Sequence, residues 1–127
     1  MSKQIMSVSG NKAMNYLLET IFKKDYELVP VKDVFEAAYR LKTNNQIEVV
    51  IVDVDFQTTL SWELIQHIKT SKLFQLPVVV LATAKSEEIE KNCYEYNIDE
   101  IFFKPFNPMD LIAAVKSTVS NVSFANA

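Results

Sequence analysis

Glycine, cysteine and histidine each occur once in this chain of 127 residues. The single cysteine, Cys93, excludes an internal disulfide, and together with the single histidine, His67, it is too little for a zinc cluster. Phosphate-binding loops of the P-loop and dinucleotide-binding kinds need several glycines, so Gly10 alone excludes both. His67 falls within a predicted helix, far from any strand end, and we interpret it as a surface residue instead of a catalytic base.

Long apolar runs and an excess of basic charge are also missing. No run approaches the roughly 20 apolar residues of a membrane span, and the first residues lack the apolar core of a signal peptide, so we expect a cytoplasmic protein that does not bind membranes. The net charge of −3 offers no basic surface for nucleic acid. Hydrophobic residues make up 49% of the chain, as in globular domains. We expect one domain over residues 1–122, a frayed tail at 123–127 and no effector domain.

The most informative stretch is the apolar run 49–52, which leads directly into Asp53. A Val/Ile run without alternating polar residues is typical of a strand that is buried on both faces of a parallel sheet. Asp53 then lies at the carboxyl end of that strand, where ligands bind in open α/β sheets. An aspartate after a strand also commonly caps a turn, and the residues of this stretch alone leave both interpretations open.

Strand-like and helix-like segments alternate along the whole chain. The pattern predicts strands at 5–8, 26–31, 48–53, 77–81 and 101–103, with helices that begin near Asn11, at Asp33, after a polar loop at 57–59, at Ser86 and at Asn107. This alternation implies right-handed crossovers and a doubly wound parallel sheet. Pro30 suits an edge strand, and Gly10 indicates either a positive φ angle or a close approach to the backbone.

The carboxyl ends of the predicted strands meet at one edge of the sheet. That edge collects Ser9 and Gly10 from the first strand, Asp53 from the third, Thr83 after the fourth and Lys104 after the fifth. A carboxylate, a hydroxyl and an ammonium at one place can handle a phosphoryl group. The carboxylate would attack phosphorus, and the lysine would hold a phosphate oxygen.

Over essentially its whole length the chain resembles the receiver domain of two-component response regulators, the CheY-like superfamily. The matching segments are 49–53, 62–65 and 76–80, and above all Lys104-Pro105-Phe106 after the last strand. The resemblance implies a flavodoxin-like (βα)5 fold, a five-stranded parallel sheet of strand order 2-1-3-4-5, and signalling without enzyme activity. It also implies a cis Lys104–Pro105 bond.

The resemblance assigns roles to residues and partners. Asp53 is the phospho-acceptor position and Lys104 the phosphate-sensing lysine, while Mg²⁺ would bind Asp53 and the backbone carbonyl of Asp55. A histidine kinase or a phosphotransfer protein would act upstream, and a downstream signalling protein would receive the output.

Several positions depart from the family pattern. Ser9 and Gly10 stand where active receivers carry the acids that hold Mg²⁺. By spacing, the hydroxyl position after the fourth strand falls on Ala82, with Thr83 one residue later, so either the loop shifts to bring Thr83 in or the hydroxyl is missing. Ile101 replaces the aromatic residue that rotates on activation.

Three functional interpretations follow from these departures. The first is an atypical receiver, or pseudo-receiver, in which Lys104 neutralises Asp53 as a permanent ion pair, phosphorylation is impaired and signalling depends on protein docking. The second is a conventional receiver that a histidine kinase switches at Asp53. The third is a small flavodoxin-like flavin-binding protein, which the lack of a Ser/Thr/Gly-rich loop after the first strand disfavours.

Overall fold

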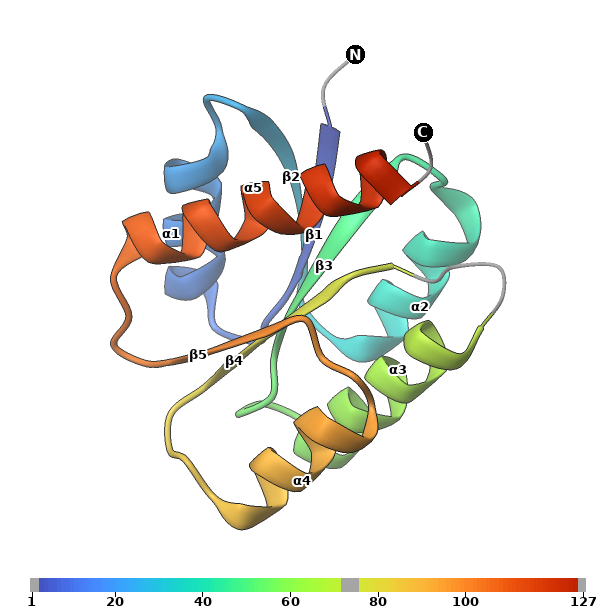
Figure 1. Cartoon of the computed structure of the whole chain (residues 1–127), viewed down its shortest axis with the longest axis vertical. Coiled ribbons are helices and arrows are strands. Elements are labelled where there is room, and N and C mark those ends of the chain that lie inside the picture. Colours follow the sequence, from blue (N-terminus) through green and yellow to red (C-terminus); the bar gives the residue numbers. More distant parts are fainter. Residues whose placement is uncertain (1–2, 72–75, 126–127) are drawn as a thin grey trace.

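Five strands alternate with five helices in the computed structural model of the chain, which describes residues 3–71 and 76–125 (Figure 1). The strands are β1 (Lys3–Val8), β2 (Tyr26–Val31), β3 (Ile47–Asp53), β4 (Val78–Ala82) and β5 (Glu100–Phe103). The helices are α1 (Lys12–Phe22), α2 (Val34–Thr43), α3 (Thr58–Thr70), α4 (Glu87–Glu95) and α5 (Pro108–Ala125). The strands form one parallel sheet in the order β2-β1-β3-β4-β5, which confirms the predicted fold and strand order.

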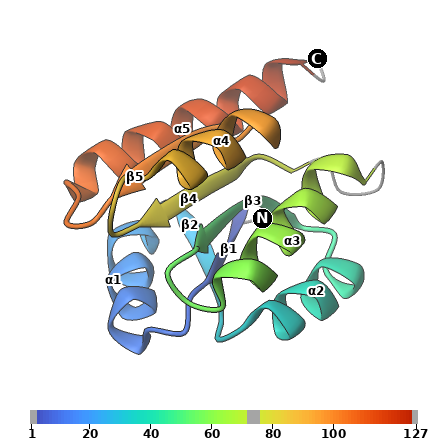
Figure 2. The ribbon, with the colours of Figure 1, turned by 90° about the horizontal axis from the view of Figure 1, so that it is seen from below.

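Helices cover both faces of the sheet: α1 and α5 lie on one face, and α2, α3 and α4 lie on the other (Figures 1 and 2). Alternate residues of β3 enter the two hydrophobic cores. Val49 and Ile51 pack with α1 and α5, whereas Val50 and Val52 pack with α2 and α3. This alternation explains why the sequence of β3 is apolar without a break, because both faces of the strand are buried.

The positions of the strands in the sheet agree with their composition. β3 and β4, the most apolar strands, both lie between two neighbours, and β2 is at the edge with Pro30 near its end. Proline lacks an amide hydrogen, so an edge strand tolerates it best. None of the helices described is both long and apolar enough to cross a membrane.

Three of the predicted helix starts are set by side-chain caps. Asn11 accepts hydrogen bonds from the first-turn amides of α1, Asp33 from the amide of Glu36, and Ser86 from the amide of Ile89. Each cap satisfies backbone donors that have no partner within the helix. The three caps confirm the boundaries predicted from the sequence.

The polar loop expected at 57–59 is shorter than predicted. Gln57 adopts a left-handed backbone conformation with φ of 49°, and α3 begins at Thr58, directly after it. The Ser61 hydroxyl also donates to the Phe56 carbonyl at 2.9 Å and closes the turn. At the other end of the chain α5 reaches Ala125, so the segment expected to fray begins as helix, and residues 126–127 lie outside the described residues.

Trp62, His67 and Cys93 differ in their burial. Trp62 is buried in the core beneath α3, and His67 is exposed on the surface of that helix. Cys93 packs against the core from α4 and is half-buried, like the other inner residues of this helix, none of which is fully buried.

Candidate functional site

Asp53 is the last residue of β3, and its side chain is only 3% exposed. Its Oδ2 accepts hydrogen bonds from the Ser9 hydroxyl at 3.0 Å and from the Lys104 ammonium at 2.8 Å. Its Oδ1 accepts from the backbone amide of Asp55 at 3.1 Å. Both carboxylate oxygens are therefore engaged, by donors that come from the ends of β1, β3 and β5.

Lys104 follows β5 and is fixed there by its backbone. Its amide donates to the Ala82 carbonyl at 2.8 Å, and the bond to Pro105 is cis, as the resemblance implied. Its ammonium lies 2.8 Å from Asp53 Oδ2 and 3.0 Å from Asp55 Oδ2. Burial alone would lower the pKa of Lys104, but hydrogen bonds and charge attraction from the two carboxylates outweigh it and raise the pKa.

Asp55 contributes its side chain to the site, whereas the sequence favoured a role for its backbone carbonyl. Its Oδ1 accepts from the Thr83 amide at 3.1 Å, and its Oδ2 accepts from the Thr83 hydroxyl at 2.5 Å and from Lys104. Burial alone would raise the pKa of Asp55, but the hydrogen bonds from Thr83 and Lys104 outweigh it and lower the pKa. Of the two alternatives that the sequence left open, the structure agrees with the first: the loop brings the Thr83 hydroxyl to the site, where it binds Asp55.

The end of β1 supplies a neutral donor where active receivers supply acids. Ser9 is 3% exposed, and its hydroxyl accepts from the Asn11 amide at 3.1 Å while it donates to Asp53. Asn15 of α1 donates to the Ser9 carbonyl at 3.0 Å and accepts from the Ser7 hydroxyl at 2.6 Å. Asn15 therefore helps to position the site. In the sequence, the one sign of this role is that Asn15 is a polar residue outside the apolar stripe of the helix.

Gly10 lies directly under an aromatic ring. A β-carbon at residue 10 would lie 2.6 to 2.8 Å from three ring atoms of Phe56. Real β-carbons essentially never approach other atoms so closely. Of the two reasons proposed for glycine here, the close approach is correct and the positive φ angle is wrong, because Gly10 does not have one.

The donor set around Asp53 fits Mg²⁺ poorly. Magnesium is held by one or two carboxylates together with other oxygen ligands. Asp53 and Asp55 supply two carboxylates, but Lys104 bridges both of them, and Ser9 and Gly10 add no acid. The Lys104 ammonium lies 2.8 Å from Asp53 Oδ2, where a metal ion would otherwise bind. The Phe56 ring lies against the Gly10 backbone. No group of three or more His, Cys, Asp or Glu side chains among the described residues could hold a metal ion.

A groove of about 290 Å³ lies between α4 and β5. Ile101, half-buried at the position of the family's rotating aromatic residue, forms part of its wall. The other lining residues are Lys85, Ile89, Glu90, Cys93 and Phe103. The pKa of the Cys93 thiol is raised by burial, so this thiol is less reactive than a free one.

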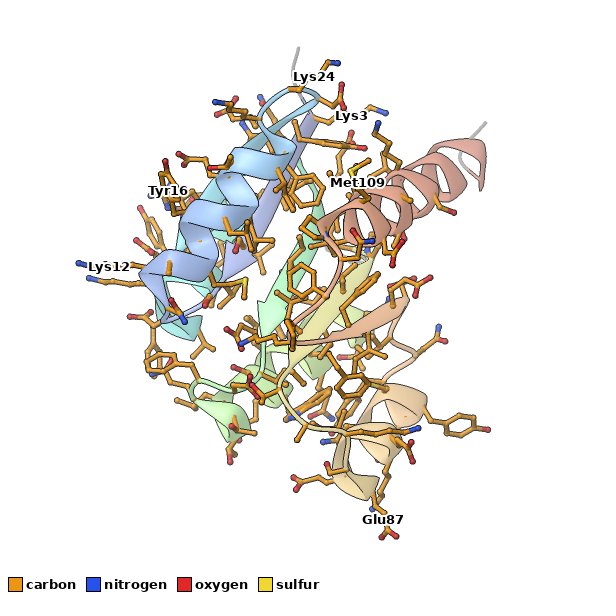
Figure 3. The ribbon with its side chains drawn as sticks, turned by 90° about the vertical axis from the view of Figure 1, so that its left-hand side faces the viewer. Lys3, Lys12, Tyr16, Lys24, Glu87 and Met109 are labelled. Atoms are coloured by element: carbon orange, nitrogen blue, oxygen red, sulfur yellow. The ribbon has the colours of Figure 1, made fainter. Side chains whose placement is uncertain are left out.

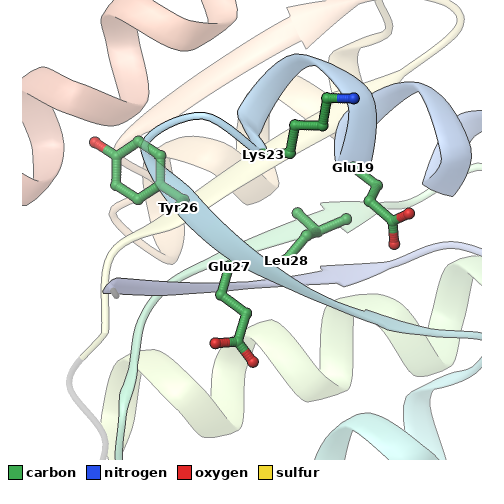
Figure 4. A pocket seen from close by; sticks show the side chains of 5 residues that line it. All are labelled: Glu19, Lys23, Tyr26, Glu27 and Leu28. Carbon is green, nitrogen blue, oxygen red and sulfur yellow. The ribbon is translucent and has the colours of Figure 1, made fainter. Parts of the chain in front are cut away.

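A second groove, of about 410 Å³, lies where α1 ends and β2 begins (Figure 4). It is lined by Glu19, Lys23, Tyr26, Glu27 and Leu28. Since Tyr26 opens β2, this groove lies at the amino ends of the strands, away from Asp53. The outer surface of α1 carries Tyr16, which is 73% exposed (Figure 3).

Comparison with known proteins identifies the family. The sequence model of the response regulator receiver domain matches residues 5–116. The chain belongs to this family. It is a receiver domain of two-component signalling, and membership favours this interpretation over the flavin-binding alternative.

Individual relatives agree with this assignment. The chain is 29% identical over 119 residues to the regulatory protein VanRc of Enterococcus gallinarum, covering 92% of the chain and 50% of the relative. It is 27% identical over 127 residues to the alkaline phosphatase synthesis transcriptional regulatory protein PhoP of Bacillus subtilis, covering 98% and 52%. The chain thus spans about half the length of the curated relatives it matches. A response regulator from Thermotoga maritima has the same fold, with a TM-score of 0.82 at 24% identity over 94% of this chain and 99% of that one.

Proposed function

We propose that this receiver is a pseudo-receiver that signals through protein contacts, with phosphorylation at Asp53 impaired. The proposal rests on one observation. Lys104 bridges the carboxylates of Asp53 and Asp55, and a serine hydroxyl stands where a metal-binding acid would be needed. In this arrangement Lys104 neutralises the buried Asp53 without a metal ion.

The chemistry of phosphoryl transfer explains why this site is impaired. An Asp53 oxygen would have to attack phosphorus while the donor's leaving group departs with its electron pair, and negative charge would develop on the transferred group. Mg²⁺ is the usual neutraliser of that charge. In this site the nearby cation is Lys104, and two carboxylates already share it.

One observation favours the alternative of a conventional receiver. Thr83 and Lys104, a hydroxyl and an ammonium, both lie at the site and are suited to phosphoryl oxygens. A receiver that worked in this way would have to bind its metal with Asp53 and with backbone or water oxygens. A histidine kinase or phosphotransfer protein would then supply the phosphoryl group.

Output from a pseudo-receiver depends on a docking surface. We place it at the groove between α4 and β5, where Ile89, Ile101 and Phe103 form an apolar floor. The exposed ion pair of Lys85 and Glu90, at 3.1 Å, lies beside it. This combination suits an apolar side chain of a downstream signalling protein or a kinase, flanked by polar groups. The domain would act through this contact without an enzyme activity of its own.

Phosphoryl transfer from acetyl phosphate tests the proposal. The chain is incubated with labelled acetyl phosphate and Mg²⁺, beside the Asp53→Asn variant and a receiver known to accept phosphate. We expect no more label on the chain than on Asp53→Asn, while the known receiver is labelled. Label that approaches one phosphoryl group per chain, and that is lost in Asp53→Asn, would overturn the proposal in favour of the conventional receiver.

A further inference from the structure

Three hydrogen-bond donors converge on the carboxylate of Asp55. The amide and the hydroxyl of Thr83 bind its two oxygens at 3.1 and 2.5 Å, and the Lys104 ammonium binds Oδ2 at 3.0 Å. Thr83 follows β4 and Lys104 follows β5, so the donors come from two neighbouring strand ends. An ammonium combined with a backbone amide and a hydroxyl is a donor set that binds anions in general.

The occupant of this donor set belongs to the same chain. Asp55 is held in place by its own amide, which donates to Asp53 Oδ1, so its carboxylate is presented to Thr83 and Lys104 by a fixed backbone. The side chain of Asp55 is 35% exposed, and that of Lys104 is 19% exposed. An anion from solvent can therefore reach these donors once the carboxylate is removed.

We propose that the Asp55 carboxylate is an internal ligand of Thr83 and Lys104 and occupies the donors that would otherwise bind an oxyanion. The external ligands of these donors are small tetrahedral oxyanions, either free inorganic phosphate or a phosphoryl group carried by Asp53. This inference rests on the proposed function, the impaired phosphorylation of Asp53. It adds a cause: the donors that a phosphoryl group on Asp53 would need are already bound to Asp55. With Asp55 bound, Thr83 and Lys104 are arranged as in an anion-bound site although Asp53 is not phosphorylated.

The internal ligand changes the energetics of phosphorylation. A phosphoryl group on Asp53 carries close to two negative charges at neutral pH and would lie beside the ionised Asp55. To gain Lys104 and Thr83 it would have to displace a carboxylate that is already held by charge-assisted hydrogen bonds. Asp55 therefore competes with the phosphoryl group for the donors of Thr83 and Lys104. Removing its carboxylate frees these three donors.

The test measures binding of inorganic phosphate by amide NMR in two variants that differ only at Asp55. Both carry Asp53→Asn, because the Asp53 charge would repel phosphate in either case. In Asp53→Asn alone, Asp55 still fills the site. In Asp53→Asn/Asp55→Ala the donors are free, and we expect saturable shifts at Thr83 and Lys104 with affinity roughly tenfold to a hundredfold higher.

Matched variants separate this effect from a general change of charge. Asp53→Asn/Asp25→Ala removes another lysine-paired aspartate, since Asp25 lies 3.3 Å from Lys116, and it should bind phosphate no better than Asp53→Asn. Adding Lys104→Ala to the Asp55→Ala variant should abolish the gain. If Asp55→Ala prevents folding, Asp55→Asn removes the charge and keeps the shape, and a smaller gain is expected.

Equal phosphate affinity with and without Asp55, in folded variants, would overturn the inference. So would a gain that survives Lys104→Ala or that appears equally in the Asp25 control, because the ion would then be bound elsewhere. These outcomes leave the proposed function standing, since it concerns transfer to Asp53 in the unmodified chain. Labelling of the unmodified chain by acetyl phosphate would instead overturn the proposed function and leave the phosphate result unchanged.

Discussion

The ring of Phe56 lies against the backbone of Gly10, so that a β-carbon at residue 10 would come within 2.6 Å of it. The residues are far apart in sequence, and the contact joins the turn after β1 to the turn after β3. The ring is 46% exposed and lies at the carboxyl edge of the sheet, where Asp53 also lies. The ring therefore leaves no room for a side chain at residue 10, the position at which an acid would otherwise stand.

A double-mutant cycle measures this contact. Gly10→Ala should lower the free energy of unfolding by about 1–3 kcal/mol, because the new methyl group overlaps the ring. In the Phe56→Ala background the same substitution should have little effect. Urea unfolding of the four proteins gives the coupling energy. An equal loss from Gly10→Ala in both backgrounds would show that the ring imposes no constraint on residue 10.

The same contact predicts how metal binding can be restored. Acids at residues 9 and 10 should create Mg²⁺ binding, and this binding should be weaker while the ring is present. Ser9→Asp/Gly10→Asp/Phe56→Ala should therefore bind Mg²⁺ roughly tenfold more tightly than Ser9→Asp/Gly10→Asp, a difference of about 1.4 kcal/mol. Calorimetric titration with Mg²⁺ measures both affinities. Tight binding by the variant that keeps Phe56 would mean that the ring moves aside freely.

Removing the charge of Lys104 should destabilise the fold. Lys104→Met leaves the carboxylate of Asp53, which is 3% exposed, without its cation. Removing one partner of a buried ion pair lowers the free energy of unfolding by about 3 kcal/mol. Lys116→Met breaks the exposed pair with Asp25 and should change the free energy of unfolding by less than about 1 kcal/mol. Adding Asp53→Asn to Lys104→Met should restore most of the loss. Urea unfolding at neutral pH measures all of these variants, and equal effects at Lys104 and Lys116 would contradict a buried ion pair.

The lowered pKa of Asp55 makes stability depend on pH. Its folded pKa lies below the ordinary value of 3.8, so on acidification the unfolded chain takes up this proton first. The contribution of Asp55 is therefore fully present above 3.8 and is lost as the pH falls through the folded pKa. Thr83 and Lys104 contact this carboxylate, and the Asp53 carboxylate accepts from the Asp55 backbone amide.

The measurement compares the unmodified chain with Asp55→Asn. The stability difference between them should be constant from neutral pH down to about pH 5 and should shrink below about pH 4. A stability difference that grows on acidification would contradict the hydrogen bonds assigned to Asp55.

Lys104 has the opposite effect, at high pH. Its pKa is raised above 10.5, so its contribution to stability is present below 10.5 and is lost as the pH rises through the folded pKa.

Most of the fold could be predicted from the sequence because its signals are local. The unbroken run of β3 follows from burial on both faces, Pro30 marks an edge, and Asn11 and Ser86 cap the helices that they precede. The length of the loop before α3 was predicted wrongly. The left-handed conformation there is adopted by Gln57, and glycine is the residue from which such a turn is usually predicted.

The site was predicted in part. The convergence of Asp53, Thr83 and Lys104 follows from the parallel sheet, since their strands end at one edge. The direction of the Asp55 side chain and the Phe56 contact with Gly10 could not be predicted, because each depends on how two turns pack against one another. Both contacts join residues of separate loops, and no local pattern of residues encodes them.

An amide NMR titration of the unmodified chain with Mg²⁺ and then with beryllofluoride, a mimic of the phosphoryl group, separates a permanent ion pair at Asp53 from a working switch. With Lys104 bound to Asp53 and Asp55, we predict no saturable shifts at Asp53, Thr83 or Lys104 at millimolar Mg²⁺ with beryllofluoride. Saturable shifts at these residues that spread to Ile101 and α4 would contradict the account and show a working phosphorylation switch.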